Sequence, residues 1–352
     1  MTSTATTQVS STVDPELAAM IDGVLADYRA TAVPTVAGER RRCDRDFWQQ
    51  LDSLGLVRLT GAERDGGSGA GWAEAAELIT AAVGHGVHLP LAEHDLLACW
   101  LIDEVSGPAE PVLHSLCQLT PGASTNLAPW AGEVDRLAVL WLGDEGHLLA
   151  QIDTADAQIT HGTNMIGEPR DRVTVDASTL RGVAVPPEVV AVVARKAAMV
   201  RAVQVCAALD HAVALSIEHA ASRVQFGRPL AKFQAIQNLI ADAAAEAALA
   251  RVATEAALNT AIGSNWRAAC LDFQIAVARS CAGQASLVVT RNAHQVHGAM
   301  GTTIEHRLHE YTRGALAWRS EFGSARSWDL QVADRASADG RSGLWEIVTS
   351  GT

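Results

Sequence analysis

The sequence predicts a mainly α-helical protein with a small β domain in its middle. Before residue 120 and after residue 187, apolar residues recur at the spacing of amphipathic helices. Between these regions they alternate with a period of two, which is typical of half-buried strands. We therefore expect a disordered lead (1–13), an N-terminal helical domain (14–120), a small middle β domain (121–187) and a C-terminal four-helix-bundle domain (188–352).

The composition favours a packed protein and excludes several partners. Of the 352 residues, 48% are apolar and 19% are charged, so most of the chain should be folded. The net charge of -13 argues against nucleic acid, which requires a basic surface. No apolar run reaches the roughly 18 residues that span a bilayer, so membrane insertion is not expected.

The first residues and the cysteines indicate a cytoplasmic protein. The start of the chain carries neither the basic residues nor the apolar run of a secretory signal. Each cysteine stands alone, without a C-x-x-C pair, which favours reduced and mostly buried thiols over disulfides. The cysteines are Cys43, Cys99, Cys117, Cys206, Cys270 and Cys281.

The predicted N-terminal domain begins with Asp14-Pro15, a helix cap followed by a proline at the first helical position. Helical spacing predicts helices at residues 14–28, 44–54, 72–83 and 91–104, with a short extended piece at 56–59. The glycine-rich segment 61–71 does not fit the dinucleotide pattern G-x-G-x-x-G, because Trp72 and Glu74 stand where its last glycine would be. We interpret this segment as a flexible connection.

The middle and C-terminal domains follow from the same periodicities. Strands are predicted at 137–142, 147–152 and 171–176, in a unit too short for a full nucleotide-binding α/β domain. Bundle helices are predicted at 188–222, from 229 onward, at 265–297, at 304–319 and after 323. The inner face of the helix at 265–297 is assigned to Trp266, Ala269, Phe273, Val277 and Cys281.

Three groups of residues are candidates for function. In SRVQFGRPLAKFQAIQNLIAD (222–242), the Arg223 guanidinium suits phosphate or carboxylate oxygens, although from these residues alone a structural corner between two helices is the favoured explanation. In QVHGAMG (295–301), small residues allow close approach of a ligand, or simply end a helix. In EHRLHE (305–310), His306 and His309 lack a third ligand, so no metal site is expected.

Two of these segments resemble signatures of the acyl-CoA dehydrogenase family. SRVQFGRPLAKFQAIQNLIAD is similar to that family's R-x-x-F-G-x-x-x-x-x-x-Q signature, and QVHGAMGTTIEHRLHEYTR resembles its Q-x-x-G-G-x-G segment. LVRLTGAERDGGSGAG also looks like a turn in the family's first domain. The helical, β, helical order matches over nearly the whole chain, so the resemblance implies an acyl-CoA dehydrogenase-like fold.

The resemblance implies FAD as the cofactor, held without a Rossmann fingerprint. In the family the two signatures hold the pyrophosphate and adenine half of a neighbouring subunit's flavin. When these roles are transferred to the matching positions of this chain, the resemblance implies that Arg223 and Gln225 contact the pyrophosphate. It also implies that the adjoining surface is lined by Phe226, Phe233 and Gln234. The nucleotide end is contacted by Gln295, Gly298 and Ala299, where alanine replaces the second glycine of the family pair.

The implied reaction is α,β-desaturation of an acyl-CoA thioester, for which a carboxylate removes the α-proton. The family places this base at one of two positions, which correspond here to Phe322 and Ala197. Neither residue is acidic. Glu321 is one residue early, so in a helix its side chain points about 100° away. The family segment that holds the flavin ring also has no counterpart between Gly122 and Gly162.

This chain keeps the expected nucleotide contacts but lacks the flavin-ring contacts and the catalytic base. In this it resembles the base-less subunit of actinobacterial α2β2 acyl-CoA dehydrogenases of the steroid side-chain type. The implied partner is a homologous acyl-CoA dehydrogenase subunit, and the implied substrate is an acyl-CoA with a bulky, for example steroid-derived, acyl group. Two alternatives stay open. One is a self-sufficient homomeric flavoenzyme that uses Glu321, and the other is a structural or regulatory member without flavin.

Overall fold

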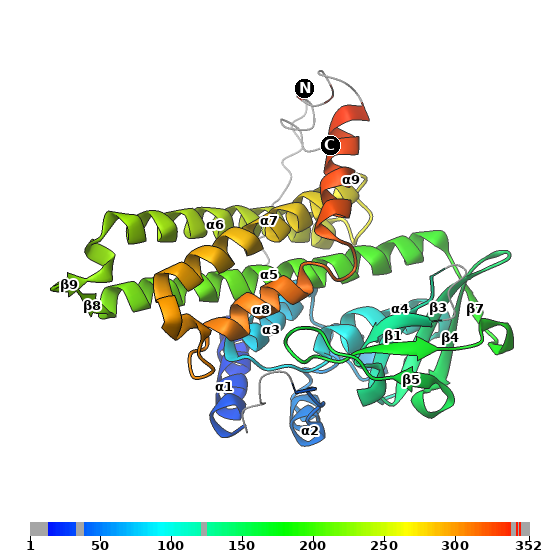
Figure 1. Cartoon of the computed structure of the whole chain (residues 1–352). Coiled ribbons are helices and arrows are strands. Elements are labelled where there is room, and N and C mark those ends of the chain that lie inside the picture. Colours follow the sequence, from blue (N-terminus) through cyan, green and yellow to red (C-terminus); the bar gives the residue numbers. More distant parts are fainter. Residues whose placement is uncertain (1–12, 33–38, 121–124, 339–342, 344, 346–352) are drawn as a thin grey trace.

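The computed structural model describes residues 13–32, 39–120, 125–338, 343 and 345. The expected disordered lead falls almost entirely outside the described residues. Helices make up the first and last parts of this fold and a small β region lies between them, as the sequence predicts (Figure 1).

The N-terminal region packs against the long bundle helix α5 (Pro187–Ser222) mainly through residues 72–85 and 92–99, and its first helix packs on residues 72–85. Asp14 caps the first helix by accepting a hydrogen bond from the Glu16 N–H at 2.8 Å, and Asp44 caps the second through the Phe47 N–H at 3.0 Å. The helical elements are α1 (Pro15–Thr31), α2 (Arg45–Ser53), η1 (Glu63–Asp65), α3 (Trp72–His85), the π-helical segment η2 (Ala92–Cys99) and α4 (Trp100–Ser106).

Two predictions for this region are wrong. Residues 57–60 form turns instead of an extended piece. The glycine-rich segment 61–71 is packed on itself, because the N–H of Ser68 donates to Arg58, that of Gly69 to Gly61 and that of Ala70 to Leu59. A Cβ on Gly67 would lie 2.2 Å from the Gly61 backbone, so glycine is required there for close packing.

The β region consists of two small sheets. One sheet has the order β1-β3-β4-β7, with β1 parallel to β3 and the other pairs antiparallel, and the other sheet has the order β2-β6-β5. The strands are β1 (His114–Gln118), β2 (Thr125–Pro129), β3 (Arg136–Gly143), β4 (Gly146–Asp153), β5 (Gln158–Thr160), β6 (Arg170–Thr174) and β7 (Val183–Val185). Since β1 precedes the composition change at Pro121, the β region starts earlier in the chain than the periodicity indicated.

The C-terminal region is a helical bundle built around α5. Its helices are α5 (Pro187–Ser222), α6 (Gln234–Gly263), α7 (Leu271–His297), α8 (Leu308–Trp318) and α9 (Ala325–Ala338). A short hairpin, β8 (Val224–Gln225) and β9 (Arg228–Pro229), joins α5 to α6 and forms one tip of the molecule (Figure 1). The short helices η6 (Leu230–Lys232) and η7 (Gly298–Thr302) complete this end.

The predicted inner face of the third bundle helix is also wrong. Asn265 and Trp266 lie in a turn with φ of 49° and 65°, so α7 begins only at Leu271. Ala269 is exposed, and Phe273, Val277 and Cys281 are only partly buried. The inner face instead contains Leu271, Ile275, Ala278, Ala282, Ala285 and Val289. All six cysteines are free, in agreement with the expectation of unpaired thiols.

None of the helices in the described part of the chain combines the length and the apolar character needed to cross a lipid bilayer.

Candidate functional site

The residues predicted to hold a nucleotide lie at the end of the bundle where α5 and α7 finish. Arg223 directly follows α5, and Gln295 stands in the last turn of α7. The two helix ends are in contact, because the rings of His219 and His297 stack with centroids 4.5 Å apart. The fold therefore brings the two sequence signatures to the same end of the molecule. We call Arg223, Gln225, Phe226, Phe233, Gln234, Gln295, Gly298 and Ala299 the bundle-tip surface.

The polar side chains of the bundle-tip surface point away from the protein. Arg223, Gln225 and Gln295 are exposed. Within the described part of the chain, the Arg223 guanidinium forms no ion pair and caps no carbonyl; only its backbone N–H donates, to His219 at 2.9 Å. Gly298 has a φ of 59° and a ψ of -142°, and a Cβ there would meet open space. These groups are free to contact a ligand.

Phe226 is the most unusual residue of this surface. It is 89% exposed and has a φ of 52°, and Gly227 next to it has a φ of 78°. Two consecutive positive φ values match the tight turn that joins hairpin strands, but a bulky residue there is strained. Phe226 contacts Phe233 edge-on at 6.1 Å, and Arg228 covers the other ring at 4.2 Å. An exposed, strained aromatic suits contact with another molecule.

The two family base positions lie close together in the interior. Ala197 is buried in an apolar cluster against which the Phe322 ring packs. The Arg201 guanidinium lies 5.1 Å from the centre of that ring. Phe322 has a φ of 52°, and a Cβ on the following Gly323 would lie 2.7 Å from the Trp328 indole. Both positions at which the family can carry its carboxylate are therefore occupied by apolar side chains.

A buried ion cluster fills the space beside these positions. Its members are Glu93, Glu168, Arg170, Arg201 and Glu321. Glu321 accepts from the Nε atoms of Arg170 and Arg201, each at 2.7 Å. Arg201 also donates to Glu93 at 2.7 Å, and Arg170 to Glu168 at 2.9 Å. The cluster joins residues of all three regions of the fold.

Glu321 is held in its ionised form by this cluster. Burial by itself raises the pKa of a carboxyl group, but the guanidinium groups of Arg170 and Arg201 outweigh burial and lower the pKa of Glu321. The pKa of Glu168 is also lowered, because Arg170 and His88 outweigh its burial. A carboxylate bound to two arginines is a weak base and is not free to reach a substrate. The geometry disfavours Glu321 as the proton acceptor.

The structure allows a direct test of how FAD fits. The bundle-tip surface offers unpaired donors and an open approach, which suit the nucleotide half. Beside the ion cluster, the cavity bordered by His88, Glu168, Gln204 and Trp318 does not suit the ring, because its volume is about 20 Å³. That is room for about one water molecule, whereas ligand sites usually need about 300 Å³ or more. The residues of this chain thus fit one half of the cofactor.

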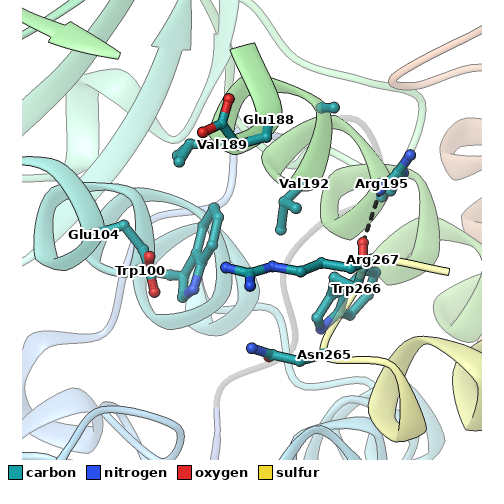
Figure 2. A pocket seen from close by; sticks show the side chains of 10 residues that line it. Trp100, Glu104, Glu188, Val189, Val192, Arg195, Asn265, Trp266 and Arg267 are labelled. Atoms are coloured by element: carbon teal, nitrogen blue, oxygen red, sulfur yellow. Dashed lines mark hydrogen bonds between the residues drawn. The ribbon is translucent and has the colours of Figure 1, made fainter. Parts of the chain in front are cut away.

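A larger pocket lies near the opposite end of α5. It has a volume of about 510 Å³, and Figure 2 shows Trp100, Glu104, Glu188, Arg195, Trp266 and Arg267 around it. Arg195 donates to the Trp266 carbonyl at 2.7 Å. At 1.5 Å per helical residue, its α5 residues lie roughly 45 Å from Arg223. This pocket is therefore separate from the bundle-tip surface.

Among the residues that the structure describes, two groups of side chains have the atoms to bind a metal ion: His94, Cys99 and His114, and His219, His297 and His306. In the first group, His94 Nδ1 already accepts from the His114 N–H at 3.0 Å, so its lone pair is occupied. The second group is considered below. The zinc pattern considered at His306 and His309 is not formed, because His309 Nε2 instead contacts the Ile304 carbonyl at 3.2 Å.

Comparison with known proteins supports the family resemblance. Residues 191–336 match the model of the acyl-CoA dehydrogenase C-terminal domain. Residues 191–336 thus form an acyl-CoA dehydrogenase C-terminal domain, and the comparisons support a member of the acyl-CoA dehydrogenase family. The acyl-CoA dehydrogenase IpdE2 of Mycolicibacterium smegmatis is 27% identical over 279 residues, which cover 77% of this chain and 82% of that protein.

Solved structures of acyl-CoA dehydrogenases share the fold. A chain of the ChsE4–ChsE5 complex from Mycobacterium tuberculosis has a TM-score of 0.79 at 18% identity and covers 93% of this chain and 98% of its own. A chain of the steroid ACAD Tcur3481–Tcur3483 also has a TM-score of 0.79, at 22% identity, and covers 91% of this chain and 96% of its own. The predicted fold class is confirmed.

Sequence reasoning missed the buried ion cluster. Arg201 stands alone in the apolar stretch AAMVRAVQVCA of α5, and such an isolated charge at a core position signals a buried partner. The partners could not be identified from the sequence, because Glu93, Arg170 and Glu321 come from distant segments.

Proposed function

We propose that this chain is the non-catalytic subunit of a heteromeric, FAD-dependent acyl-CoA dehydrogenase. The observation that carries the proposal is the replacement of the base by Phe322 and Ala197, beside an ion cluster that holds the nearest carboxylate, Glu321. When bound, FAD accepts a hydride from the acyl-CoA. Among the described residues, the two base positions carry no carboxylate, and the cavity beside the ion cluster is too small for the flavin ring.

The proposed role of this chain is to hold the nucleotide half of a partner subunit's FAD. Arg223 donates to the pyrophosphate, supported by Gln225, while Gln295, Gly298 and Ala299 contact the nucleotide end. Phe226, Phe233 and Gln234 form the adjoining wall. All eight residues lie at one end of the bundle, and the strained, exposed Phe226 supports contact with a second subunit.

The names of two similar structures support this proposal. One is the ChsE4–ChsE5 complex, and the other is the steroid ACAD Tcur3481–Tcur3483. They support a homologous partner in an α2β2 assembly and a bulky, steroid-type acyl-CoA as the substrate class.

The proposal is tested by Arg223→Ala in the complex purified with its partner. Losing a hydrogen bond to a charged group costs about 1.5–3 kcal/mol, so we expect flavin to dissociate roughly ten- to a hundredfold more readily while the fold is retained. Arg251→Ala is the matched control, because Arg251 is also exposed but pairs with Asp210 on the bundle surface. Unchanged flavin retention in Arg223→Ala would show that this arginine is only a helix-corner residue.

A further inference from the structure

Three histidines from separate segments meet at the bundle end. His219 is in the last turn of α5, His297 is the final residue of α7, and His306 lies between η7 and α8. The rings of His219 and His297 are 4.5 Å apart, and those of His297 and His306 are 4.7 Å apart. One nitrogen from each residue lies within 4.8 Å of the other two.

The hydrogen bonding of His297 leaves a buried lone pair. Its Nδ1–H donates to the Ala293 carbonyl at 2.8 Å, so the neutral ring carries its lone pair on Nε2. That Nε2 is buried and has no hydrogen-bond partner among the described residues. His297 itself is only 4% exposed. Metal-binding histidines commonly donate their second nitrogen to a backbone carbonyl in this way, which fixes the tautomer and aims the ligand atom.

The protonation of His219 and His297 also favours a cation. Burial lowers the pKa of His297 to about 4, and its histidine neighbours contribute to this. Burial likewise lowers the pKa of His219, with further contributions from His306 and Arg223. His219 and His297 are therefore neutral at pH 7, which is the form that binds metal ions. The positive charge of Arg223 opposes a cation, so binding relies on several good nitrogen donors.

We propose that His219, His297 and His306 bind a divalent transition-metal ion of the zinc class. Zinc–nitrogen bonds of about 2.0–2.1 Å place tetrahedral ligands roughly 3.3 Å apart. Since the three nitrogens lie within 4.8 Å of one another, they must close by up to about 1.5 Å. His306 would give up a 3.2 Å contact from the Leu308 N–H to its Nδ1. Because His306 is only partly buried, the fourth position is left to water. The ion would tie the end of α5 to the segment that follows α7.

The experiment uses the untagged full-length chain, freed of metal with a chelator and titrated with Zn²⁺ and Co²⁺. We expect about one equivalent to bind, with the visible absorption bands of tetrahedral Co²⁺. His297→Asn and His306→Gln should each weaken binding at least about tenfold and abolish those bands. His309→Gln is the control, because His309 is a neighbouring, partly buried histidine outside the cluster, and this variant should bind metal normally.

The proposal is overturned if the wild type binds no stoichiometric metal, or if the His297 and His306 variants bind as the wild type does. Equal loss in His309→Gln would also overturn it, since binding would then be non-specific. If His297→Asn does not fold, His306→Gln decides, because His306 is only partly buried and its replacement leaves the α5–α7 contact intact. Metal binding is measured without flavin, so its result does not depend on the proposed function.

Discussion

Replacing Glu321 by Gln separates a structural role of this residue from a catalytic one. Its carboxylate accepts four hydrogen bonds, two from Arg170, one from Arg201 and one from Asn164. An amide keeps the shape but removes the negative charge and places an N–H₂ against guanidinium donors. Breaking a buried ion pair by removing one partner costs about 3–5 kcal/mol.

This cost can be measured as a change in Tm. With an unfolding entropy of about 2.1 cal/mol/K per residue, the 352-residue chain has roughly 0.74 kcal/mol/K. A loss of 3–5 kcal/mol then lowers Tm by about 4–7 °C. Asp210→Asn is the control, because the exposed Asp210–Arg251 pair should contribute at most about 1 kcal/mol. Calorimetry of both variants of the isolated chain is the assay.

The pH dependence of the Glu321→Gln effect has a definite sign. The pKa of Glu321 is lowered in the folded protein, so its contribution to stability is complete above the unfolded value of about 4.5 and is lost as the pH falls below it. The Tm difference between wild type and variant should stay constant from pH 8 to 6 and narrow below about 4.5. The reasoning is refuted if Glu321→Gln abolishes dehydrogenase activity in the complex without lowering Tm, which is the behaviour of a catalytic base.

Two further substitutions test other parts of the structure. Gly67→Ala should destabilise the chain by about 1–3 kcal/mol, because the new Cβ would lie 2.2 Å from the Gly61 backbone, whereas Gly263→Ala, which meets open space, should have little effect on Tm. Equal Tm values for these two variants would show that the glycine-rich segment is not packed. Phe226→Asn should stabilise the isolated chain by about 1 kcal/mol through relief of backbone strain, and should weaken flavin retention in the complex. If Phe226→Asn is no more stable than the wild type, the assignment of backbone strain at Phe226 is contradicted. If the complex of this variant retains flavin as the wild type does, the assignment of Phe226 to the flavin site is contradicted.

The fold was largely predictable from the sequence, because its helices and strands follow local periodicity and clear caps such as Asp14 and Asp44. The errors arose where tertiary packing overrides local pattern. The left-handed turn at Asn265 and Trp266 delays the start of α7 and shifts its inner face. The glycines at 61–71 form a packed loop because their backbones approach one another, and no periodicity reveals such an approach.

The candidate site was predictable only in part. The positions of Phe322 and Ala197 follow from aligning the chain with family motifs, and the structure places the two together. The ion cluster and the histidine cluster consist of residues that lie far apart in the sequence. Each of their members has an ordinary explanation when considered alone, as His306 does within EHRLHE.

The central claim is most directly tested by the flavin content of this chain purified alone and together with its partner subunit. The account predicts a colourless, inactive chain alone, and a yellow complex in which both the flavin and the acyl-CoA dehydrogenase activity depend on the partner. Stoichiometric FAD together with dehydrogenase activity in the isolated chain would contradict it.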